Sequence, residues 1–153
     1  MVGQPDTSRM HRRLVDSLYV EAMLLADEAR TYFDEAGRFE RDVLAPLDRV
    51  SFSCESLKVT TRLMHIIAWL LTQRAVDSGE LSPGDARTPS RRLGFAAETD
   101  GATLATMPPQ AATIIATSTD LYRRVARIDA TADMHLIVDS PARTMMQRLA
   151  AAF

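Results

Sequence analysis

A chain of 153 residues is long enough to bury the core of one domain, and we expect residues 1–153 to form a single one. Its hydrophobic fraction of 46% and charged fraction of 25% are ordinary for a soluble globular protein. The net charge of −2 gives no general attraction to nucleic acid or to an anionic membrane surface. The composition therefore disfavours nucleic-acid and membrane partners.

Cysteine usage and apolar runs indicate the compartment. Cys54 is the only cysteine, so no internal disulfide can form, and this fits a reducing environment. The N-terminal residues lack the apolar region of a secretory signal. The longest apolar run, residues 66–71, is far shorter than the roughly 20 residues of a membrane span. We expect a cytoplasmic protein.

The first predicted element is a long amphipathic helix over residues 9–36. At about 100° per residue, its apolar side chains share one arc, and Asp16, Asp27 and Asp34 lie on the other side. Gly37 is well placed to end this helix. The residues expected on the buried arc are Leu14, Leu18, Ala22, Leu25, Ala29, Tyr32 and Phe33.

A second long helix is predicted over residues 54–78, because Ser53 can cap its first N–H groups and Gly79 follows it. Pro46 is expected to break a short helical turn within residues 38–50. The apolar side chains of the second helix cover about 200° of its circumference, wider than the stripe of about 100° on a surface helix. We therefore expect this helix to be central, with core residues Leu63, Ile67, Leu70 and Leu71.

Residues 79–108 hold four of the six glycines and are predicted to be a connection. A third long helix follows over residues 109–129, and a short terminal helix over about 141–152. The apolar run 136–138 could pair as a strand, but a single short run cannot make a sheet. The prediction is an all-α fold: a bundle of three long antiparallel helices plus a short C-terminal helix.

The sequence contains no phosphate loop, dinucleotide fingerprint or nucleophile elbow. Its three histidines lie far apart in sequence, and a metal site would need convergence of separate elements, so we expect no metal, no organic cofactor and no enzymatic activity. The polar face of the second helix could do acid–base or anion-binding work if a pocket lay over it, but a solvated stripe is the favoured interpretation. This face carries Glu55, Lys58, Arg62, His65, Thr72 and Gln73.

Arginines cluster in three places, and a DNA-binding regulator would need them on one face of the protein. Acidic residues are interspersed with the first cluster, so solvated helix faces are favoured for all three. The clusters are Arg9, Arg12 and Arg13; Arg91 and Arg92; and Arg123, Arg124 and Arg127.

Several apolar residues instead indicate protein partners. Trp69 lies on the polar arc of the second helix, where another element or another chain must cover it. Because two neighbouring helices cannot easily bury the wide apolar face as well, we expect a homodimer. The terminal helix is either docked on its own bundle, which is favoured, or a detachable contact element. The predicted partner or dimer contacts are Val20, Leu24, Arg62, His65, Trp69, Met145, Leu149 and Phe153.

Three runs of the chain carry a family resemblance. The longest is SCESLKVTTRLMHIIAWLLTQRAV at residues 53–76; the others are YVEAMLLADEARTYF at 19–33 and LYRRVARID at 121–129. The first closely resembles the RcdA family, the bacterial regulators of CtrA degradation, and the other two look similar. The connection and the tail match least.

The resemblance implies a homodimeric three-helix bundle that acts as a proteolytic adaptor. Its partners would be a ClpX-type unfoldase and response-regulator cargo of the ClpXP protease. No catalytic residue is carried over, because the family has no catalytic motif. Two alternatives stay open: a small-molecule-binding protein or enzyme that uses Lys58, Arg62, His65 and Trp69, or a DNA-binding regulator.

Overall fold

The computed structural model describes residues 4–139 and 141–152, and these residues form helices joined by short turns and one long connection, with no strand among them. The predicted all-α bundle is confirmed, and residues 136–138 belong to a helix. The elements are α1 Gln4–Asp34, α2 Ala36–Asp42, α3 Pro46–Asp77, α4 Gly101–Ala105, α5 Pro109–Asp139 and α6 Pro141–Ala151, with two short 3-10 turns, η1 Asp85–Arg87 and η2 Pro89–Arg91.

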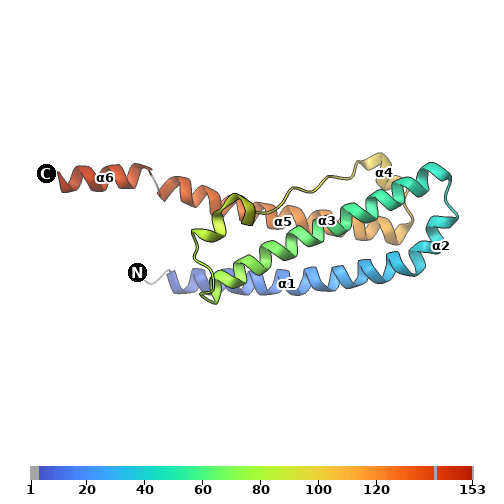
Figure 1. Ribbon diagram of the computed structural model, residues 1–153, viewed down its shortest axis with the longest axis horizontal. Coiled ribbons are helices and arrows are strands. Elements are labelled where there is room, and N and C mark those ends of the chain that lie inside the picture. Colours follow the sequence, from blue (N-terminus) through green and yellow to red (C-terminus); the bar gives the residue numbers. More distant parts are fainter. Residues whose placement is uncertain (1–3, 140, 153) are drawn as a thin grey trace.

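The helices α1 and α3 form an antiparallel pair. At one end, Arg12 Nη2 donates a hydrogen bond to the backbone oxygen of Asp77 over 3.3 Å. At the other end, the rings of Tyr32 and Phe52 lie 6.4 Å apart between their centroids. Early residues of α1 thus meet late residues of α3, as in a helical hairpin (Figure 1).

The helices α3 and α5, in contrast, run parallel to each other. Arg62 contacts Ser118 through a hydrogen bond of 3.2 Å, and Trp69, further along α3, contacts Asp129, further along α5, over 3.0 Å. The expectation that all neighbouring long helices are antiparallel is therefore wrong for this pair. The reason is the connection 78–108, which runs back along the whole bundle before α5 begins (Figure 1).

The start of α3 also differs from the prediction. The helix begins at Pro46 rather than near Ser53, because proline is well suited to the first helical position, where its missing N–H is not needed. The preceding Ala45 is extended, with φ −60° and ψ 152°. Cys54 therefore lies well inside the helix and not at its N-terminus.

Gly37 does not end α1. It lies within α2 and is buried, and a Cβ at this position would come within 2.8 Å of the backbone oxygen of Tyr32. Close packing at the corner between α1 and α2 requires a glycine there. Helix α1 instead ends at Asp34, before the chain reaches Gly37.

The end of α3 matches the prediction. Gly79 adopts φ +80°, and its N–H donates to the oxygen of Val76 over 3.1 Å. The next N–H, that of Glu80, donates to the oxygen of Ala75 over 2.9 Å. These two bonds form a Schellman motif, which satisfies carbonyl groups at the helix end and favours glycine at the left-handed position.

The third long helix, α5, continues to Asp139, ten residues beyond its predicted end at residue 129. The terminal helix α6 occupies nearly the predicted range. It projects past the end of the bundle where α1 begins (Figure 1).

The core lies between the three long helices. Leu63 and Leu70 are buried as predicted, Ile67 is half-buried, and the prediction is wrong for Leu71, which is 48% exposed. Leu14 of α1, which was also expected to be buried, is 44% exposed. The buried core is formed by Val15, Leu18, Ala22, Leu25, Ala29, Tyr32, Phe52, Val59, Leu63, Ile66, Trp69, Leu70, Met107, Ala111, Ile114, Ile115, Leu121 and Val125.

Leu70→Ala should lower the free energy of unfolding by about 2–5 kcal/mol, because it leaves a cavity in a tightly packed core. Leu71→Ala removes the same atoms from the same helix at an exposed position and should cost less than about 1 kcal/mol. Urea unfolding of both variants measures the difference. Equal losses would contradict the assignment of these two neighbours to opposite sides of the core boundary.

Candidate protein-contact surfaces

The polar face of α3 is covered by the connection. Residues 93–100 have no regular secondary structure and pass over Arg62, which is only 2% exposed. Its Nη2 donates to the backbone oxygen of Ala97 over 3.0 Å and to Thr99 Oγ1 over 2.7 Å, while Nη1 donates to Ser118 Oγ on α5. One guanidinium group therefore joins α3, α5 and the connection.

A buried carboxylate completes this network. Glu55 is 2% exposed; it accepts a hydrogen bond from the hydroxyl of Thr99 and another from Lys58 Nζ over 2.9 Å. Lys58 also donates to the backbone oxygen of Glu98 over 3.2 Å. Burial lowers the pKa of Arg62 from its ordinary value, while attraction to Glu55 opposes this shift. The network neutralises charges that would otherwise be costly to bury.

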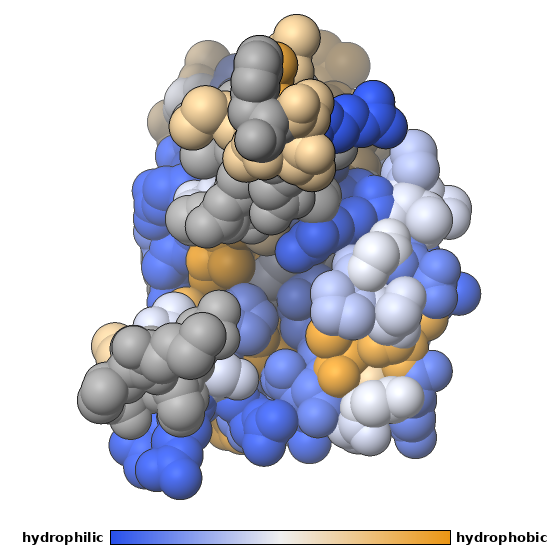
Figure 2. All heavy atoms as spheres, turned by 90° about the vertical axis from the view of Figure 1, so that its left-hand side faces the viewer, coloured by the Kyte–Doolittle hydropathy of each residue, from blue (hydrophilic) through white to orange (hydrophobic). Residues whose placement is uncertain are grey.

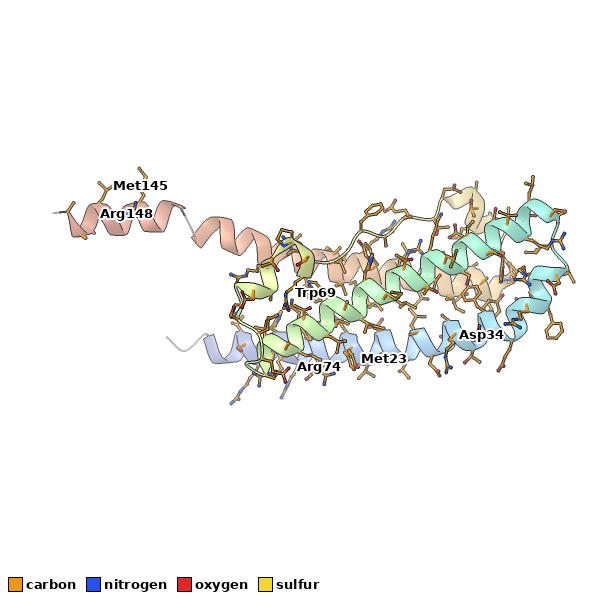
Figure 3. All side chains as sticks on the ribbon, viewed as in Figure 1. Met23, Asp34, Trp69, Arg74, Met145 and Arg148 are labelled. Atoms are coloured by element: carbon orange, nitrogen blue, oxygen red, sulfur yellow. The ribbon has the colours of Figure 1, made fainter. Side chains whose placement is uncertain are left out.

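Trp69 is covered by its own chain. It is 3% exposed, and its Nε1 donates to Asp129 Oδ1 over 3.0 Å. Arg92 from the connection binds the same carboxylate with two hydrogen bonds of 2.9 and 3.0 Å. In Figure 3, Trp69 lies between α3 and the connection. Its need for cover is met without a second chain, so Trp69 no longer supports dimerisation.

His65 packs beneath the connection as well. A Cβ on Gly94 would come within 2.7 Å of His65 Nδ1, so only glycine allows the backbone to pass this closely. The hydroxyl of Tyr122 donates to the backbone oxygen of Gly94 over 2.7 Å and fixes the connection from the α5 side. His65 Nδ1 is buried and has no hydrogen-bond partner among the residues that the structure describes.

The polar face of α3 is thus not the solvated stripe that the sequence favoured. A cavity of about 320 Å³ lies beside Arg62, and residues 95–98 and Tyr122 also line it. Sequence reasoning found the residues of this face as a group but missed what they bind. The connection supplies the hydrogen-bond acceptors: the backbone oxygens of Ala97 and Glu98 and the hydroxyl of Thr99. This arrangement holds residues 93–100 against α3.

Half of the eight arginines in the three clusters bind acidic groups or backbone oxygens: Arg12, Arg92, Arg123 and Arg124. Arg124 binds Glu21 of α1 in a bidentate pair and also contacts Asp120 over 3.1 Å. The hydrogen bond to Glu21 raises the pKa of Arg124 above its ordinary value. Arg123 lies 3.6 Å from Glu98. These pairs reduce the positive potential that DNA binding would need.

An exposed apolar row on α3 is the feature that sequence analysis did not separate from the core. Val50, Leu57, Met64 and Leu71 are 62, 68, 64 and 48% exposed, and we call these four residues the α3 stripe. They recur every seven residues, which places them on one side of the helix. Leu57, Met64 and Leu71 belong to the wide apolar arc of the second predicted helix, and their heptad spacing is the signal that separates them from the core.

The positions between the stripe residues are small. Cys54, Thr61 and Ala68 follow each stripe residue by four positions, and all three are exposed. Together the two sets alternate at spacings of four and three, the a and d pattern of a coiled coil, with large residues at one position and small ones at the other. The row is therefore suited to close packing against another helix.

A groove of about 320 Å³ lies next to the stripe, between α1 and α3, and Met64 belongs to both. Its polar residues are Arg30, Asp34, Ser56 and Thr60, so its edges can form hydrogen bonds. The apolar residues of the groove are Ala26, Ala29, Phe33, Leu63, Met64 and Ile67.

Of the other predicted contact residues, Val20 and Leu24 are 57 and 68% exposed on α1, with Met23 beside them. On α6, Met145 and Leu149 are 69 and 55% exposed. Figure 3 shows Met145 beyond the end of the bundle. Phe153 lies outside the described residues.

Within the described residues, no group of His, Cys, Asp and Glu side chains could hold a metal ion. Over the same residues, no helix has the length and apolarity that a membrane crossing demands.

The parallel α3–α5 pair and the returning connection distinguish this protein from helical bundles in which all neighbouring long helices are antiparallel. The family described as "Protein of unknown function (DUF1465)" matches residues 6–153. The crystal structure of RcdA from Caulobacter crescentus CB15 is 34% identical in sequence and has a TM-score of 0.64, covering 78% of this chain and 90% of that chain. Among curated proteins, none matches. The chain belongs to the RcdA family, as the resemblance of its three runs had indicated.

Arg62→Met should lower the free energy of unfolding by about 3–5 kcal/mol, the usual loss when one member of a buried charged network is removed. It should also speed chymotrypsin cleavage at Phe95, because residues 93–100 lose their central anchor. The matched control is Arg74→Met on the same helix, whose side chain is 45% exposed in its contact with Asp16 and should cost less than about 1 kcal/mol. Cleavage at Phe95 that is equally fast in both variants would show that Arg62 does not hold the connection.

Proposed function

We propose that this protein is a non-enzymatic adaptor in regulated proteolysis, which acts as a homodimer in the cytoplasm and helps deliver cell-cycle regulator cargo to the ClpXP protease. The observation that carries the proposal is the exposed α3 stripe on a bundle of the RcdA family. An adaptor needs surfaces that hold other proteins, and exposed apolar rows with few charges are typical of such surfaces.

The α3 stripe is the surface that we assign to the dimer. Between Glu55 and Asp77, α3 carries no acidic residue, and its basic residues Lys58, Arg62 and Arg74 contact groups of their own chain. A second α3 can therefore approach without strong like-charge repulsion. The small side chains between the stripe residues allow the two helices to lie close together.

The energy of this contact indicates a dimer of modest affinity. Burying one such side chain fully gives about 1.5–3 kcal/mol, and the stripe residues are about half to two-thirds exposed. Eight side chains from two copies then contribute on the order of 10 kcal/mol. Association itself costs about 4–15 kcal/mol, so the adjoining groove must contribute if the dimer is to persist at low concentration.

Two further surfaces remain available to the unfoldase and to cargo. Val20 and Leu24 lie on the outer side of α1, away from its core residues. Met145 and Leu149 lie on the projecting helix α6, and exposed methionines adapt to differently shaped partners. We propose these two pairs as partner contacts, separate from the dimer surface.

Replacing Leu57 and Met64 with aspartate in the same chain should dissociate the dimer, because four charges would face one another across the two-fold axis. Light scattering should give the monomer mass at micromolar concentration, with the helical circular dichroism unchanged. The control is Ala116→Asp, an exposed position on α5, which should leave the mass at that of a dimer. A parent chain that is already monomeric at this concentration would refute the dimer.

The adaptor role is tested by capture from native lysate with the full chain as bait, and we expect a ClpX-type unfoldase and response-regulator proteins among the captured proteins.

Removing residues 141–153 should abolish capture of one of these partners while leaving the melting temperature unchanged, since α6 contacts little of the bundle beyond α5. The control bait is the Leu57 and Met64 double variant, which reports on the dimer alone. A large drop in melting temperature on deletion would instead make the tail part of the core, and absence of both partners would refute the adaptor role.

A further inference from the structure

The connection carries backbone groups that no other described part of the chain uses. Residues 93–100 follow η2 without regular secondary structure and run along one side of the bundle to α4 (Figure 1). The residues at the two ends of this segment are extended, Arg92 with φ −71° and ψ 165° and Asp100 with φ −75° and ψ 154°. The N–H groups of residues 93–99 form no hydrogen bond with any described residue. Unpaired backbone of this kind is a template for a second extended chain.

The carbonyl groups that are bonded show which way the segment faces. Gly94 accepts the hydroxyl of Tyr122, so its backbone is directed toward the helices. In an extended chain, the N–H and C=O of one residue point to the side opposite to those of the next. Phe95 therefore directs both of its backbone groups away from the helices. This alternation ends at Ala97, whose oxygen is bound by Arg62.

The cavity beside Arg62 adjoins this outward-facing residue. It measures about 320 Å³, and its accessible lining is mostly apolar, with Phe95 from the connection and Tyr122 and Ala126 from α5. The Phe95 side chain is 84% exposed, whereas the donors of the buried Arg62 are occupied by the connection and α5. An occupant therefore meets the aromatic ring and not the guanidinium group. An exposed aromatic residue beside a cavity suits one large apolar side chain of a partner.

The unpaired backbone decides between a helical and an extended partner. A helix satisfies its N–H and C=O groups internally and offers none along its length. An extended peptide offers both at every second residue and can exchange two hydrogen bonds with Phe95, as in strand addition to an exposed edge. Because the segment is already held by the helices, little backbone freedom is lost on binding.

The charges nearby favour an acidic partner. Arg91 and Arg127 are exposed and bind no acidic group within the described residues. Arg127 lies one helical turn beyond Arg123, which lines the cavity, so it is on the same face of α5. The nearby carboxylate of Glu98 already faces Arg123 over 3.6 Å. Acidic residues beside the apolar anchor would therefore complement the unpaired arginines.

This surface is separate from the contacts assigned above. The connection and α5 cover one flank of α3, whereas the α3 stripe is exposed on the helix. Figure 2 views the bundle from the end where both termini lie, and that end is mostly hydrophilic with hydrophobic residues showing between. A partner that is held along the side of the bundle leaves the α3 stripe and α6 available.

We propose that residues 93–97 are a docking strand for an extended peptide of a partner protein, in which one large apolar residue is flanked by acidic residues. The peptide exchanges backbone hydrogen bonds with Phe95, places its apolar side chain in the cavity beside Arg62, and brings its carboxylates near Arg127. This inference rests on the proposed adaptor function, since it names a segment through which the adaptor holds a partner.

The probe is a phage-displayed library of short random peptides, selected against the full chain. We expect the enriched peptides to combine a large apolar residue with acidic neighbours and β-branched residues. Enrichment of basic peptides, of peptides with the apolar spacing of a helix, or of none at all would overturn the proposal.

The selected peptide, synthesised with a fluorescent label, is then titrated against variants by fluorescence anisotropy. Phe95→Ala removes the ring, and Phe95→Pro removes the ring and the N–H while suiting an extended backbone. The proline variant should bind about three- to tenfold more weakly than the alanine variant, the effect of one lost hydrogen bond. Equal affinities would exclude backbone pairing. In the parent chain, amide exchange at Phe95 should slow when the peptide binds, and unchanged exchange would overturn the proposal without any variant.

Two further variants test the cavity and the charges. Ala126→Phe fills the cavity from α5 and should abolish binding while the melting temperature of the free protein stays constant. Arg127→Glu should weaken binding, whereas Arg38→Glu, an exposed arginine on α2, should leave it unchanged. Full affinity in Ala126→Phe would overturn the proposal.

The proposed adaptor function and the docking strand fail in different ways. Peptide binding by a chain that captures neither the unfoldase nor response regulators from lysate would refute the adaptor role alone. Capture of those partners by a chain that selects no peptide would refute the docking strand alone.

Discussion

The fold depends on the burial of Arg62. Its guanidinium group reaches two residues of the connection and one of α5, and all three contacts are possible only because α3 and α5 run parallel with the connection laid between them. A charge buried this deeply is stable only when its donors are satisfied. The position of the third long helix, the cover over Trp69 and the cavity beside Arg62 all follow from this constraint.

The long helices could be predicted because their apolar spacing is local information. Their relative direction could not, since it depends on the path of residues 78–108, which carry no helical periodicity. Arg62 and Glu55 illustrate the difficulty: seven residues apart on one face, they are typical of a solvated stripe. Only the backbone that later packs on them, with Ala97 and Thr99, turns that stripe into an interior network.

The exposed apolar surfaces were partly predictable. The exposure of Val20 and Leu24 follows from their place opposite the core arc of α1, and the structure confirms it. The excess apolar width of α3 was also recognised, but an angular count cannot distinguish buried Leu70 from exposed Leu71 one position on. Their difference arises because α5 and the connection occupy one flank of α3 and leave the other open.

The returning connection also determines the order in which the protein can fold. The hairpin of α1 and α3 can close before α5 is synthesised, whereas the bond from Arg124 of α5 to Glu21 of α1 spans 103 residues. Contacts of such high sequence separation form late and slowly. A nascent chain therefore exposes the apolar face of the hairpin until α5 emerges, and such transiently exposed surface is prone to aggregation.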